Sequence, residues 1–380
     1  MMHNFYFIPT TYIPNTAATN RAISYIKGFS ELGIETTVID FCPDEKMHCY
    51  SENHDHVVIK HYWQHYFLNI GSLKYFSLLL YYILFLINLK PGDIILIYSS
   101  ANIWYWIKKI KPKVKVFLEH TENPEVVGIG GKFLTPSWDN YFKSLPKLDG
   151  LFVITTALKE YFVSKGVNPD KIHIANITVD PSRFDKVNKQ PHNDRRIVYC
   201  GTASNNKDGV DQLIKSFAIV ASKYEDVKLF ILGPVPKNDE AGNLKLIKDL
   251  QLEKRIVLTG MIAAKDMPQK LIDADILALD RPNNVQAKYG FATKMGEYLL
   301  SKNPVVVSRV GDFDLFLSDK ESAVFAVPDN CESFAKQLTW VLENKELGIA
   351  IGKKGFEVAM KHFSYIEVVK SISLTMGLIQ

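Results

Sequence analysis

Short apolar runs alternate with longer amphipathic segments along the first half of the chain. The runs have the length and composition of buried strands, at Asn4–Ile8, Glu35–Asp40, Asp93–Tyr98, Val114–Glu119, Gly150–Ile154 and Ile172–Ala175. The segments between them have helical periodicity, at Thr19–Leu32, Ile103–Ile110 and Thr156–Lys165. Strand and helix in alternation predict parallel strands joined by helical crossovers. Residues 41–66 follow neither pattern and are predicted to be irregular.

The same alternation restarts after a polar stretch, Thr178–Asn193, which we interpret as a linker. Strands are predicted at Arg196–Cys200, Val227–Leu232, Ile256–Thr259, Ile276–Leu279 and Pro304–Val307, and helices at Val210–Lys223, Ala241–Leu250 and Asp266–Ala274. The pattern predicts an α/β protein of two Rossmann-like, doubly wound domains that face each other across a cleft. We expect these domains at residues 1–180 and 181–360, and a C-terminal helix in 361–380 that packs back on the first domain.

The strongest apolar run, Phe76–Ile87, lies inside a predicted helix at Phe67–Leu89. It is shorter than the ~20 residues that span a bilayer, and Lys74 and Lys90 bracket it. Two interpretations stay open: a helix packed on the sheet, or an interfacial helix that touches the membrane. Aromatic residues that favour the headgroup zone support the second, namely Trp63, Tyr66, Tyr75, Tyr81 and Tyr82.

Composition narrows the class of protein. The chain has 380 residues, 47% of them hydrophobic and 23% charged, as in globular proteins of about two domains. A net charge of +4 does not indicate nucleic acid, although it permits weak attraction to anionic lipid. Four cysteines without a Cys-x-x-Cys pair, and no signal-peptide pattern, predict a cytoplasmic protein. A peripheral location at the inner face of the membrane stays open as an alternative. The spacing of Cys42, His48, Cys49, His54 and His56 fits no standard zinc site, so no metal is expected.

The stretch Tyr289–Val307 combines a loop, a helix opening near Thr293 and a buried strand. Gly290 lets the backbone approach a ligand, and the start of the helix offers unpaired N–H groups that suit a phosphate. Glu297 lies about one turn into the helix, within reach of the same ligand. A sugar nucleotide has this layout, with a ribose beside two phosphates. The alternative is an ordinary helix–strand unit with a surface glutamate.

Two further segments carry candidate chemistry. Lys207, in the small-residue loop Gly201–Gly209, would place a flexible ammonium near a diphosphate, and its alternative is a solvated loop lysine. His120 and Glu122 follow a predicted strand, where open α/β sheets bind ligands. His120 could donate a hydrogen bond or act as an acid or base, and its alternative is a structural turn histidine. Gly128, Gly130 and Gly131 indicate a mobile loop nearby.

Several segments, in order, resemble the family 4 glycosyltransferases, which have the GT-B fold and include enzymes of bacterial polysaccharide and capsule synthesis. They correspond to the family's "KI…NGVD" run, "GR…KG" loop, "FxG" segment, "ADvfvlPS" strand and donor-binding "GF…K..EY…G.PVV" stretch. The matching segments are Lys171–Asp180, Tyr199–Gly209, Leu258–Gly260, the strand after Ala274-Asp275, and Gly290–Leu299 with Asn303–Val307. The resemblance is close over residues 150–335 and holds only in outline for the N-terminal half.

The resemblance implies a donor site and a reaction. Glu297 would hold the ribose hydroxyls, and His120 would meet the donor sugar from the other domain. The diphosphate would bind Lys207 and the backbone of Phe291, Ala292 and Thr293, next to Gly290 and the loop at Gly201 and Thr202. Gly260 and Ile262 would flank the base. The family moves a sugar from a nucleotide sugar, UDP- or GDP-linked, to a glycan or lipid-linked acceptor, with retention of configuration and without a metal or other cofactor.

Three single positions and one turn depart from the family pattern. Tyr289 stands where an acid is usual, eight residues before Glu297, and Thr202 replaces the arginine of the basic pair, for which Arg281 or Lys294 would have to compensate. Ile177 replaces the "NGVD" glycine, and Thr16-Ala17-Ala18 stands in the turn that normally has paired glycines. Two alternatives therefore accompany the transferase prediction: a nucleotide-sugar epimerase on the same fold, and a non-catalytic partner in a glycan-assembly complex.

Overall fold

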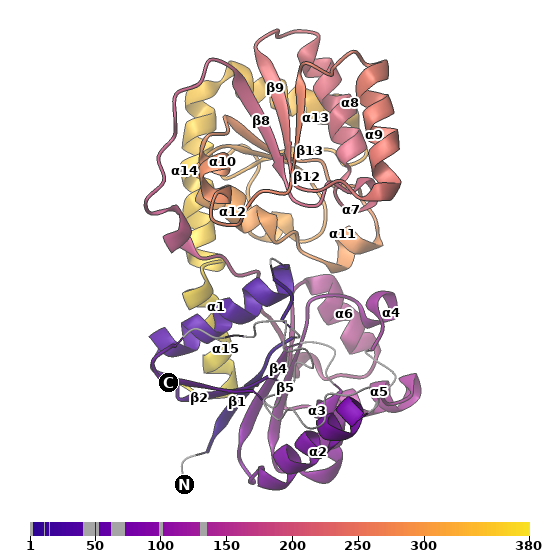
Figure 1. Ribbon diagram of the computed structural model, residues 1–380, viewed down its shortest axis with the longest axis vertical. Helices are drawn as coiled ribbons and strands as arrows, with labels where there is room; N and C mark the ends of the chain where they lie inside the picture. The colour runs from indigo at the N-terminus through magenta and orange to yellow at the C-terminus, as the bar shows by residue number, and fades with distance from the viewer. Residues whose placement is uncertain are drawn as a thin grey trace. The chain divides into compact units, whose positions relative to one another are not determined.

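The structure is a computed structural model that describes residues 3–10, 12–14, 16–40, 50, 53–61, 73–98, 102–129 and 135–380, apart from the side chains of 73–75 and 77. The chain divides into two compact units. Unit 1 comprises residues 1–178 and 365–380, and unit 2 comprises residues 179–364. Each unit is an α/β sandwich with helices on both faces of a parallel sheet (Figure 1).

Unit 1 contains a seven-stranded parallel sheet in the order β3-β2-β1-β4-β5-β6-β7. Its strands are β1 (Phe5–Ile8), β2 (Thr36–Asp40), β3 (Val57–His61), β4 (Ile94–Tyr98), β5 (Lys115–His120), β6 (Gly150–Val153) and β7 (Ile172–Ile174). Its helices are α1 (Ala17–Glu31), α2 (Leu73–Asn88), α3 (Ile103–Ile110), α4 (Pro124–Val127), α5 (Trp138–Ser144), α6 (Thr156–Ser164) and α15 (Tyr365–Met376), with short 3-10 turns η2 (Leu145–Lys147) and η3 (Pro169–Lys171).

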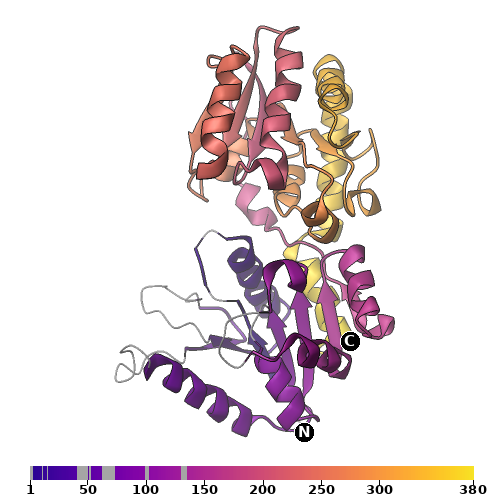
Figure 2. The same ribbon diagram turned by 90° about the vertical axis from the view of Figure 1, so that its right-hand side faces the viewer.

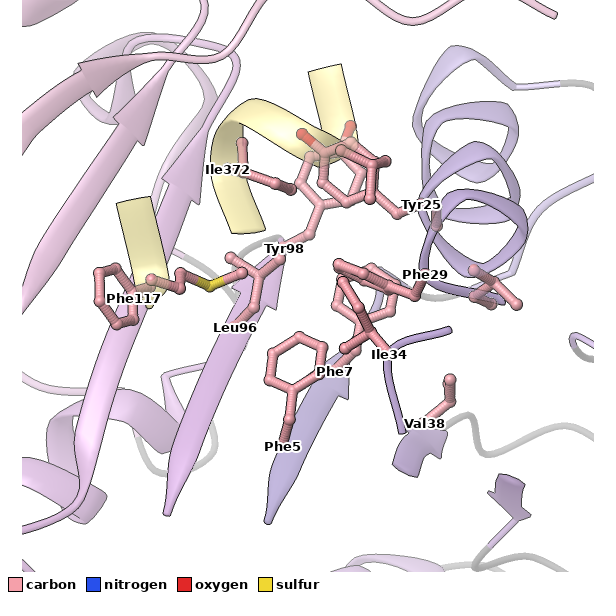
Figure 3. Close-up of a cluster of buried hydrophobic side chains, with 14 of the residues drawn as sticks. Phe5, Phe7, Tyr25, Phe29, Ile34, Val38, Leu96, Tyr98, Phe117 and Ile372 are labelled. Atoms are coloured by element: carbon pink, nitrogen blue, oxygen red, sulfur yellow. The ribbon is translucent and has the colours of Figure 1, made fainter. Parts of the chain in front are cut away.

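The core of unit 1 explains why its C-terminal helix belongs to it. Phe7 and Leu96 of the sheet lie against Tyr25 and Phe29 of α1, and Ile372 of α15 joins the same cluster (Figure 3). Gly28 lies so close to α15 that a Cβ there would be 2.6 Å from the Val369 side chain. Helix α15 therefore packs directly on α1, although more than 300 residues of chain separate them.

Unit 2 contains a six-stranded parallel sheet in the order β10-β9-β8-β11-β12-β13. Its strands are β8 (Arg195–Cys200), β9 (Val227–Leu232), β10 (Ile256–Gly260), β11 (Ile276–Leu279), β12 (Val305–Ser308) and β13 (Val324–Ala326). Its helices are α7 (Asn205–Asp208), α8 (Val210–Ala221), α9 (Lys237–Asp249), α10 (Met267–Ile272), α11 (Val285–Tyr289), α12 (Lys294–Leu300), α13 (Cys331–Glu343) and α14 (Lys345–His362), with η4 (Pro181–Phe184) and η5 (Phe313–Leu315).

Most strands begin and end within two residues of their predicted bounds, because each is a buried apolar run with polar flanks. Strand β3 contradicts the prediction that residues 41–66 are irregular, and helix α11 was not predicted. Strand β3 pairs in parallel with β2 along the sheet edge, and its half-exposed, alternating side chains lack the fully apolar signature of an inner strand. Helix α11 spans five residues behind an Asn284 cap, too short for helical periodicity to register.

Candidate functional site

The order of strands in unit 2 places its binding edge between β8 and β11. Chain connections leave β8 toward β9 on one side, whereas β11 and β12 extend the sheet on the other. In open α/β sheets, ligands bind beyond the carboxyl ends of the strands at such a reversal. Gly201 follows β8 directly at this point, and Arg281 lies two residues beyond the end of β11. This edge is the candidate functional site.

Two glycines allow the loops at this edge to touch through their backbones. Gly233, after β9, has a φ of 128°, and a Cβ there would be 2.1 Å from the carbonyl oxygen of Gly201. The Gly233 amide also donates to the Gly260 carbonyl oxygen at 2.9 Å. The loops after β8, β9 and β10 therefore form one continuous backbone surface, which contains the predicted residues Gly201 and Gly260.

Lys294 supplies a cation beside Gly201. Its ammonium lies 2.9 Å from the Tyr199 hydroxyl and donates to the carboxylate of Asp208, which is 2% exposed. A Cβ at Gly201 would lie 2.6 Å from the same ammonium. Burial lowers the pKa of Lys294, and the charge of Asp208 opposes that shift. Of the two residues considered as substitutes for an arginine at Thr202, Lys294 is the one that carries its charge to this loop.

Arg281, the other potential substitute, contacts the segment between α11 and α12. Its guanidinium is 3% exposed and donates to the carbonyl oxygens of Gly290 and Gln286, at 3.3 and 3.2 Å. It therefore braces the loop between α11 and α12. Phe291 is buried too, in a cluster with Phe313 and Phe316, so a ligand could meet this segment only through its backbone and through the exposed Thr293. Ala292 is also buried.

Lys207 lies exposed in α7, a single turn capped by the hydroxyl of Ser204. Its ammonium has no hydrogen-bond or ion-pair partner among the described residues. Its charge still acts on Lys294, whose pKa it helps to lower, so the two ammonium groups are electrostatic neighbours. Thr202 is exposed in the same loop. The exposed ammonium of Lys207 lies near the partly buried ammonium of Lys294, whose charge Asp208 offsets, so Lys207 supplies the net positive charge that favours a diphosphate.

Glu297 lies in the first turn of α12, whose seven residues give only a small dipole. Its carboxylate accepts a hydrogen bond from Arg183, which also donates to the Ala264 carbonyl oxygen at 2.9 Å. Tyr298, the next residue, ties α12 to β8 because its hydroxyl accepts from the Cys200 amide at 2.6 Å. Burial, and then the charge of Glu297, raise the pKa of Cys200 to about 12. Glu297 therefore lies near the end of β8.

Sequence reasoning missed Arg183, which belongs to η4 in the stretch interpreted as a linker. The signal was present, since Arg183 follows the matched Lys171–Asp180 segment by three residues. Gly233 was also missed, although a glycine directly after an apolar strand is a usable signal. Ile262 is half-buried two residues after β10, and Tyr289 ends α11. Unit 2 thus holds all of the residues that the resemblance assigns to the donor site except one.

That exception, His120, ends β5 in unit 1. Its ring lies 2.7 Å from the Tyr141 hydroxyl and stacks on Phe162. Burial lowers the pKa of His120 to about 4, so the ring is neutral at pH 7. The preceding Glu119 is buried and bonded to Arg21 at 2.6 Å and to Tyr25 at 3.1 Å. His120 therefore suits a hydrogen-bonding role better than that of a general acid at neutral pH. Of the predicted loop glycines, Gly130 and Gly131 lie outside the described residues.

No group of three or more His, Cys, Asp or Glu side chains in the described part of the chain is arranged to hold a metal ion. Cys42, His48 and Cys49 lie outside that part, so the sequence-based expectation about this cluster stays a prediction.

Comparison with known proteins shows which family and which solved structures this chain is similar to. Residues 194–344 match the family model described as "Glycosyl transferases group 1". The chain is similar to the crystal structure of Anabaena HepE in complex with UDP and glucose, with a TM-score of 0.74, 15% identity and 100% of both chains covered. It is also similar to a glycosyltransferase from Rickettsia africae (TM-score 0.73, 16% identity, 99% and 98% covered) and to sucrose-phosphate synthase of Thermosynechococcus elongatus (0.73, 12%, 98% and 98%). No curated protein matched the chain.

The similar structures establish the GT-B fold, with two parallel-sheet, Rossmann-like domains. The family match falls on unit 2, the unit that contains the Gly201 loop, Lys294 and Glu297. Together these findings give the chain a GT-B fold whose unit 2 is similar to the family described as "Glycosyl transferases group 1".

Proposed function

We propose that this protein is a retaining hexosyltransferase of the family 4 type, which transfers a sugar from a UDP- or GDP-sugar to a glycan or lipid-linked acceptor in polysaccharide synthesis. The observation that carries the proposal is the gathering of Glu297, Lys294 and Lys207 around the glycine loops at the β8–β11 edge. One carboxylate for ribose hydroxyls beside two ammonium groups for a diphosphate is the set that such a donor requires.

In the proposed reaction, the bond between the anomeric carbon and the diphosphate oxygen breaks, and a bond from that carbon to an acceptor hydroxyl oxygen forms on the same face. The acceptor proton passes to the departing diphosphate. Negative charge grows on the diphosphate as the bond breaks, so Lys207 and Lys294 stabilise the transition state more than the ground state. Transfer in this scheme requires no metal or other cofactor. Asp208 and Tyr199 hold Lys294 in place, which limits reorganisation during the reaction.

His120 has a supporting role in this proposal. A neutral imidazole bonded to Tyr141 keeps a fixed ring orientation and has one nitrogen left for a sugar hydroxyl. Arg183 orients the Glu297 carboxylate, because it donates to one carboxylate oxygen and anchors itself on Ala264. The other carboxylate oxygen then has two lone pairs free for the two ribose hydroxyls.

Calorimetric titration with UDP-, GDP- and ADP-sugars tests the donor class. We expect binding of a UDP- or GDP-sugar with a Kd in the micromolar range, about −8 kcal/mol, and about tenfold or greater weakening in Lys207→Gln, since a charge-assisted contact contributes ~1.5–3 kcal/mol. UDP is the first candidate because it is bound in the similar HepE structure. Lys336→Gln, which changes an exposed lysine of α13, is the control and should bind like the native protein. Absence of binding to every nucleotide sugar would contradict the proposal.

The departures at Tyr289 and Thr202 favour a second candidate, a non-catalytic partner in a glycan-assembly complex. Lys294 weakens that case because it returns a cation to the loop at Thr202. An epimerase on the same fold would release free nucleotide without transfer to an acceptor. Product analysis with donor and a panel of glycan and lipid-linked acceptors separates the three functions.

The acceptor side includes a proposed contact of α2 with the inner face of the membrane. Among the described residues, no helix has the length and apolar character to span a bilayer. However, α2 exposes a stripe of five large apolar side chains with helical spacing, namely Phe76, Leu80, Ile83, Leu84 and Ile87. Its opposite face is anchored, with Phe85 buried against Tyr6. Figure 2 shows α2 at the lower left, along the outer side of unit 1.

Cations border the end of this stripe. Lys90 is exposed just beyond α2, and the Lys111 ammonium donates to the carbonyl oxygens of Ile87 and Leu89. An exposed apolar stripe with lysines beside it fits the surface of an anionic bilayer.

In vesicle sedimentation, we expect the protein to bind anionic vesicles and to bind neutral vesicles about tenfold less, since each lysine near the surface contributes ~1 kcal/mol. The double variant Phe76→Ser/Ile87→Ser should lose most of this binding, because both side chains are more than 60% exposed and would enter the headgroup region. Leu244→Ser removes an equally apolar, exposed residue of α9 in unit 2 and is the matched control. Equal loss in both variants would contradict a role for α2.

A further inference from the structure

A cavity of about 410 Å³ lies at the edge of the unit 2 sheet opposite to the donor site. Its lining includes the starts of β8 and β11 and the turn before β12, at Arg195, Ile276 and Pro304. The other wall comes from the end of α13 and the first turns of α14. Since the strands are parallel, this amino-terminal edge is separate from the carboxyl edge of Gly201 and Lys294. The proposed donor therefore does not account for the cavity.

The cavity combines an apolar floor with a cationic rim. The floor includes Ile272, Ile276, Pro304, Val341 and Leu342, so it can take the apolar part of a ligand. The rim includes five lysine or arginine residues and a single carboxylate, that of Asp275. The side chains that line the cavity therefore have a formal net charge of +4, five minus one. The potential at this rim therefore attracts anions.

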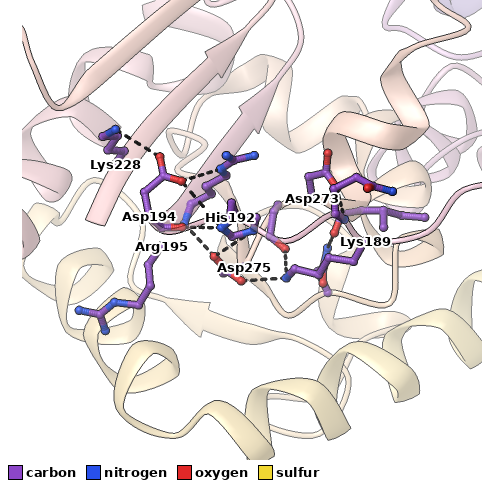
Figure 4. A network of polar contacts seen from close by, with 12 residues as sticks. Lys189, His192, Asp194, Arg195, Lys228, Asp273 and Asp275 are labelled. Atoms are coloured by element: carbon purple, nitrogen blue, oxygen red, sulfur yellow. Dashed lines mark hydrogen bonds and ion pairs between the residues drawn. The ribbon is translucent and has the colours of Figure 1, made fainter. Parts of the chain in front are cut away.

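Two of the five cations, Lys189 and Arg195, already have carboxylate partners. Figure 4 shows the contacts of Lys189. Lys189 donates to Asp275 at 2.8 Å and to the Ala274 carbonyl oxygen at 2.7 Å. Arg195 makes two hydrogen bonds to Asp226, at 2.6 and 2.7 Å. These pairs neutralise the Asp275 side of the cavity, so the attraction for an anion comes from the remaining three lysines.

Those three lysines, Lys302, Lys345 and Lys353, have no carboxylate partner among the described residues. Lys345 and Lys353 lie eight residues apart on α14, with Ile349 midway, so all three side chains share one face of the helix. The rim thus presents two ammonium groups with an apolar side chain between them, and Lys302 adds a third from the facing turn.

Lys302 is held there at a conformational cost. Its φ of 62° is in the left-handed region, which glycine adopts freely and a lysine adopts at a cost. The turn is fixed by α14, because a Cβ at Gly352 would be 2.2 Å from the Lys302 carbonyl oxygen. The ammonium of Lys302 also lies 4.4 Å from the centre of the Phe356 ring. Glycine would fit this backbone conformation better than lysine. We therefore infer that the lysine is present for its charge at the rim of the cavity.

We propose that this cavity is a second binding site for an amphipathic phosphate, a phosphomonoester carried on an apolar body. The three lysines would surround the phosphate as point charges, and the apolar floor would bury the hydrocarbon. The inference does not depend on the proposed transferase activity, because it uses neither Glu297 nor the loops at the carboxyl edge. The same chemistry is found in a soluble alkyl or prenyl phosphate and in a phosphatidic acid headgroup.

Calorimetric titration of the full chain with monomeric octyl phosphate tests this site. We expect binding, with inorganic phosphate and neutral octyl glucoside each at least about tenfold weaker, since each lacks half of the complementary surface. Lys302→Gly should weaken octyl phosphate binding about tenfold while its unfolding midpoint stays equal or rises, because glycine relieves the backbone. Lys353→Gln should weaken binding similarly. Lys354→Gln is the matched control, since Lys354 is paired with Glu357 and does not line the cavity.

The outcomes distinguish a lipid headgroup from a soluble ligand. They also distinguish the proposed site from its alternatives. Octyl phosphate binding together with capture of phosphatidic acid vesicles, both weakened in Lys302→Gly, supports a lipid headgroup; octyl phosphate binding without vesicle capture supports a soluble ligand. The Phe76→Ser/Ile87→Ser variant should retain octyl phosphate binding, which distinguishes this site from α2. Native-like binding by Lys302→Gly, or equal affinity for inorganic phosphate or octyl glucoside, would overturn the proposal. Nucleotide-sugar titration of the same variants reports independently on the donor site.

Discussion

Replacement of Glu297 by alanine is expected to weaken UDP binding, and transfer with it, by ~100- to 1,000-fold. In the proposed donor complex the carboxylate accepts hydrogen bonds from two ribose hydroxyls, and each bond to a charged acceptor contributes ~1.5–3 kcal/mol. The fold should tolerate the change, because the ion pair with Arg183 is about one quarter to one third exposed and such pairs contribute ~1 kcal/mol or less. Calorimetry with UDP and denaturant unfolding measure the two effects separately.

A change in the ligand provides the matched control for Glu297. Native protein should bind 2′,3′-dideoxy-UDP as weakly as Glu297→Ala binds UDP, and the variant should not distinguish the two nucleotides. This cycle isolates the contact between carboxylate and ribose from any general disturbance of α12. Glu297→Gln, which keeps one acceptor oxygen, should fall between. If the variant still preferred UDP over the dideoxy form by the native ratio, Glu297 would have no contact with the ribose.

The second large effect is expected for Gly233→Ala, which should destabilise unit 2 by about 3 kcal/mol or more and abolish UDP binding. The backbone at φ 128° is strained for any residue with a Cβ, at a cost of ~1–3 kcal/mol. In addition, the new methyl group would be 2.1 Å from the Gly201 carbonyl oxygen, so one of the two loops must move. Urea unfolding and nucleotide titration measure the outcome.

Gly242→Ala is the control for that substitution. Gly242 lies exposed in α9, and a Cβ there meets nothing within 4 Å. Alanine should stabilise this helix by up to about 1 kcal/mol, because it removes the entropy cost of a mid-helix glycine. The two variants thus make the same chemical change with opposite expected signs. Equal stability of both would show that the loop after β9 can open without cost.

The elements of this fold follow from local patterns, and the exceptions have physical reasons. Buried parallel strands are apolar on both faces, so β9 and β11 have the bounds that periodicity predicts. Strand β3 was missed because an edge strand with one exposed face has a weaker pattern. The loop–helix–strand unit around Glu297 was also predictable, since glycine, a helix start and an apolar run are adjacent in the sequence.

The partners of these side chains were not predictable in the same way. The pairing of Arg183 with Glu297, and of Lys294 with Asp208, joins residues 114 and 86 positions apart. The pKa of His120 is lowered by the burial that Tyr141 and Phe162 help to create, and the sequence by itself had left the residue open as an acid or base.

By itself, the sequence determined the two alternations of strand and helix, the glycine loops and the types of charge available for a nucleotide sugar, because these depend on neighbours within a few residues. Only the tertiary structure decided which cation lies beside the Gly201 loop, which residue is paired with Glu297, and where three lysines without a carboxylate partner among the described residues line an apolar cavity. Those arrangements depend on strand order and helix packing, which bring distant residues within a few ångströms and remove their charges from water.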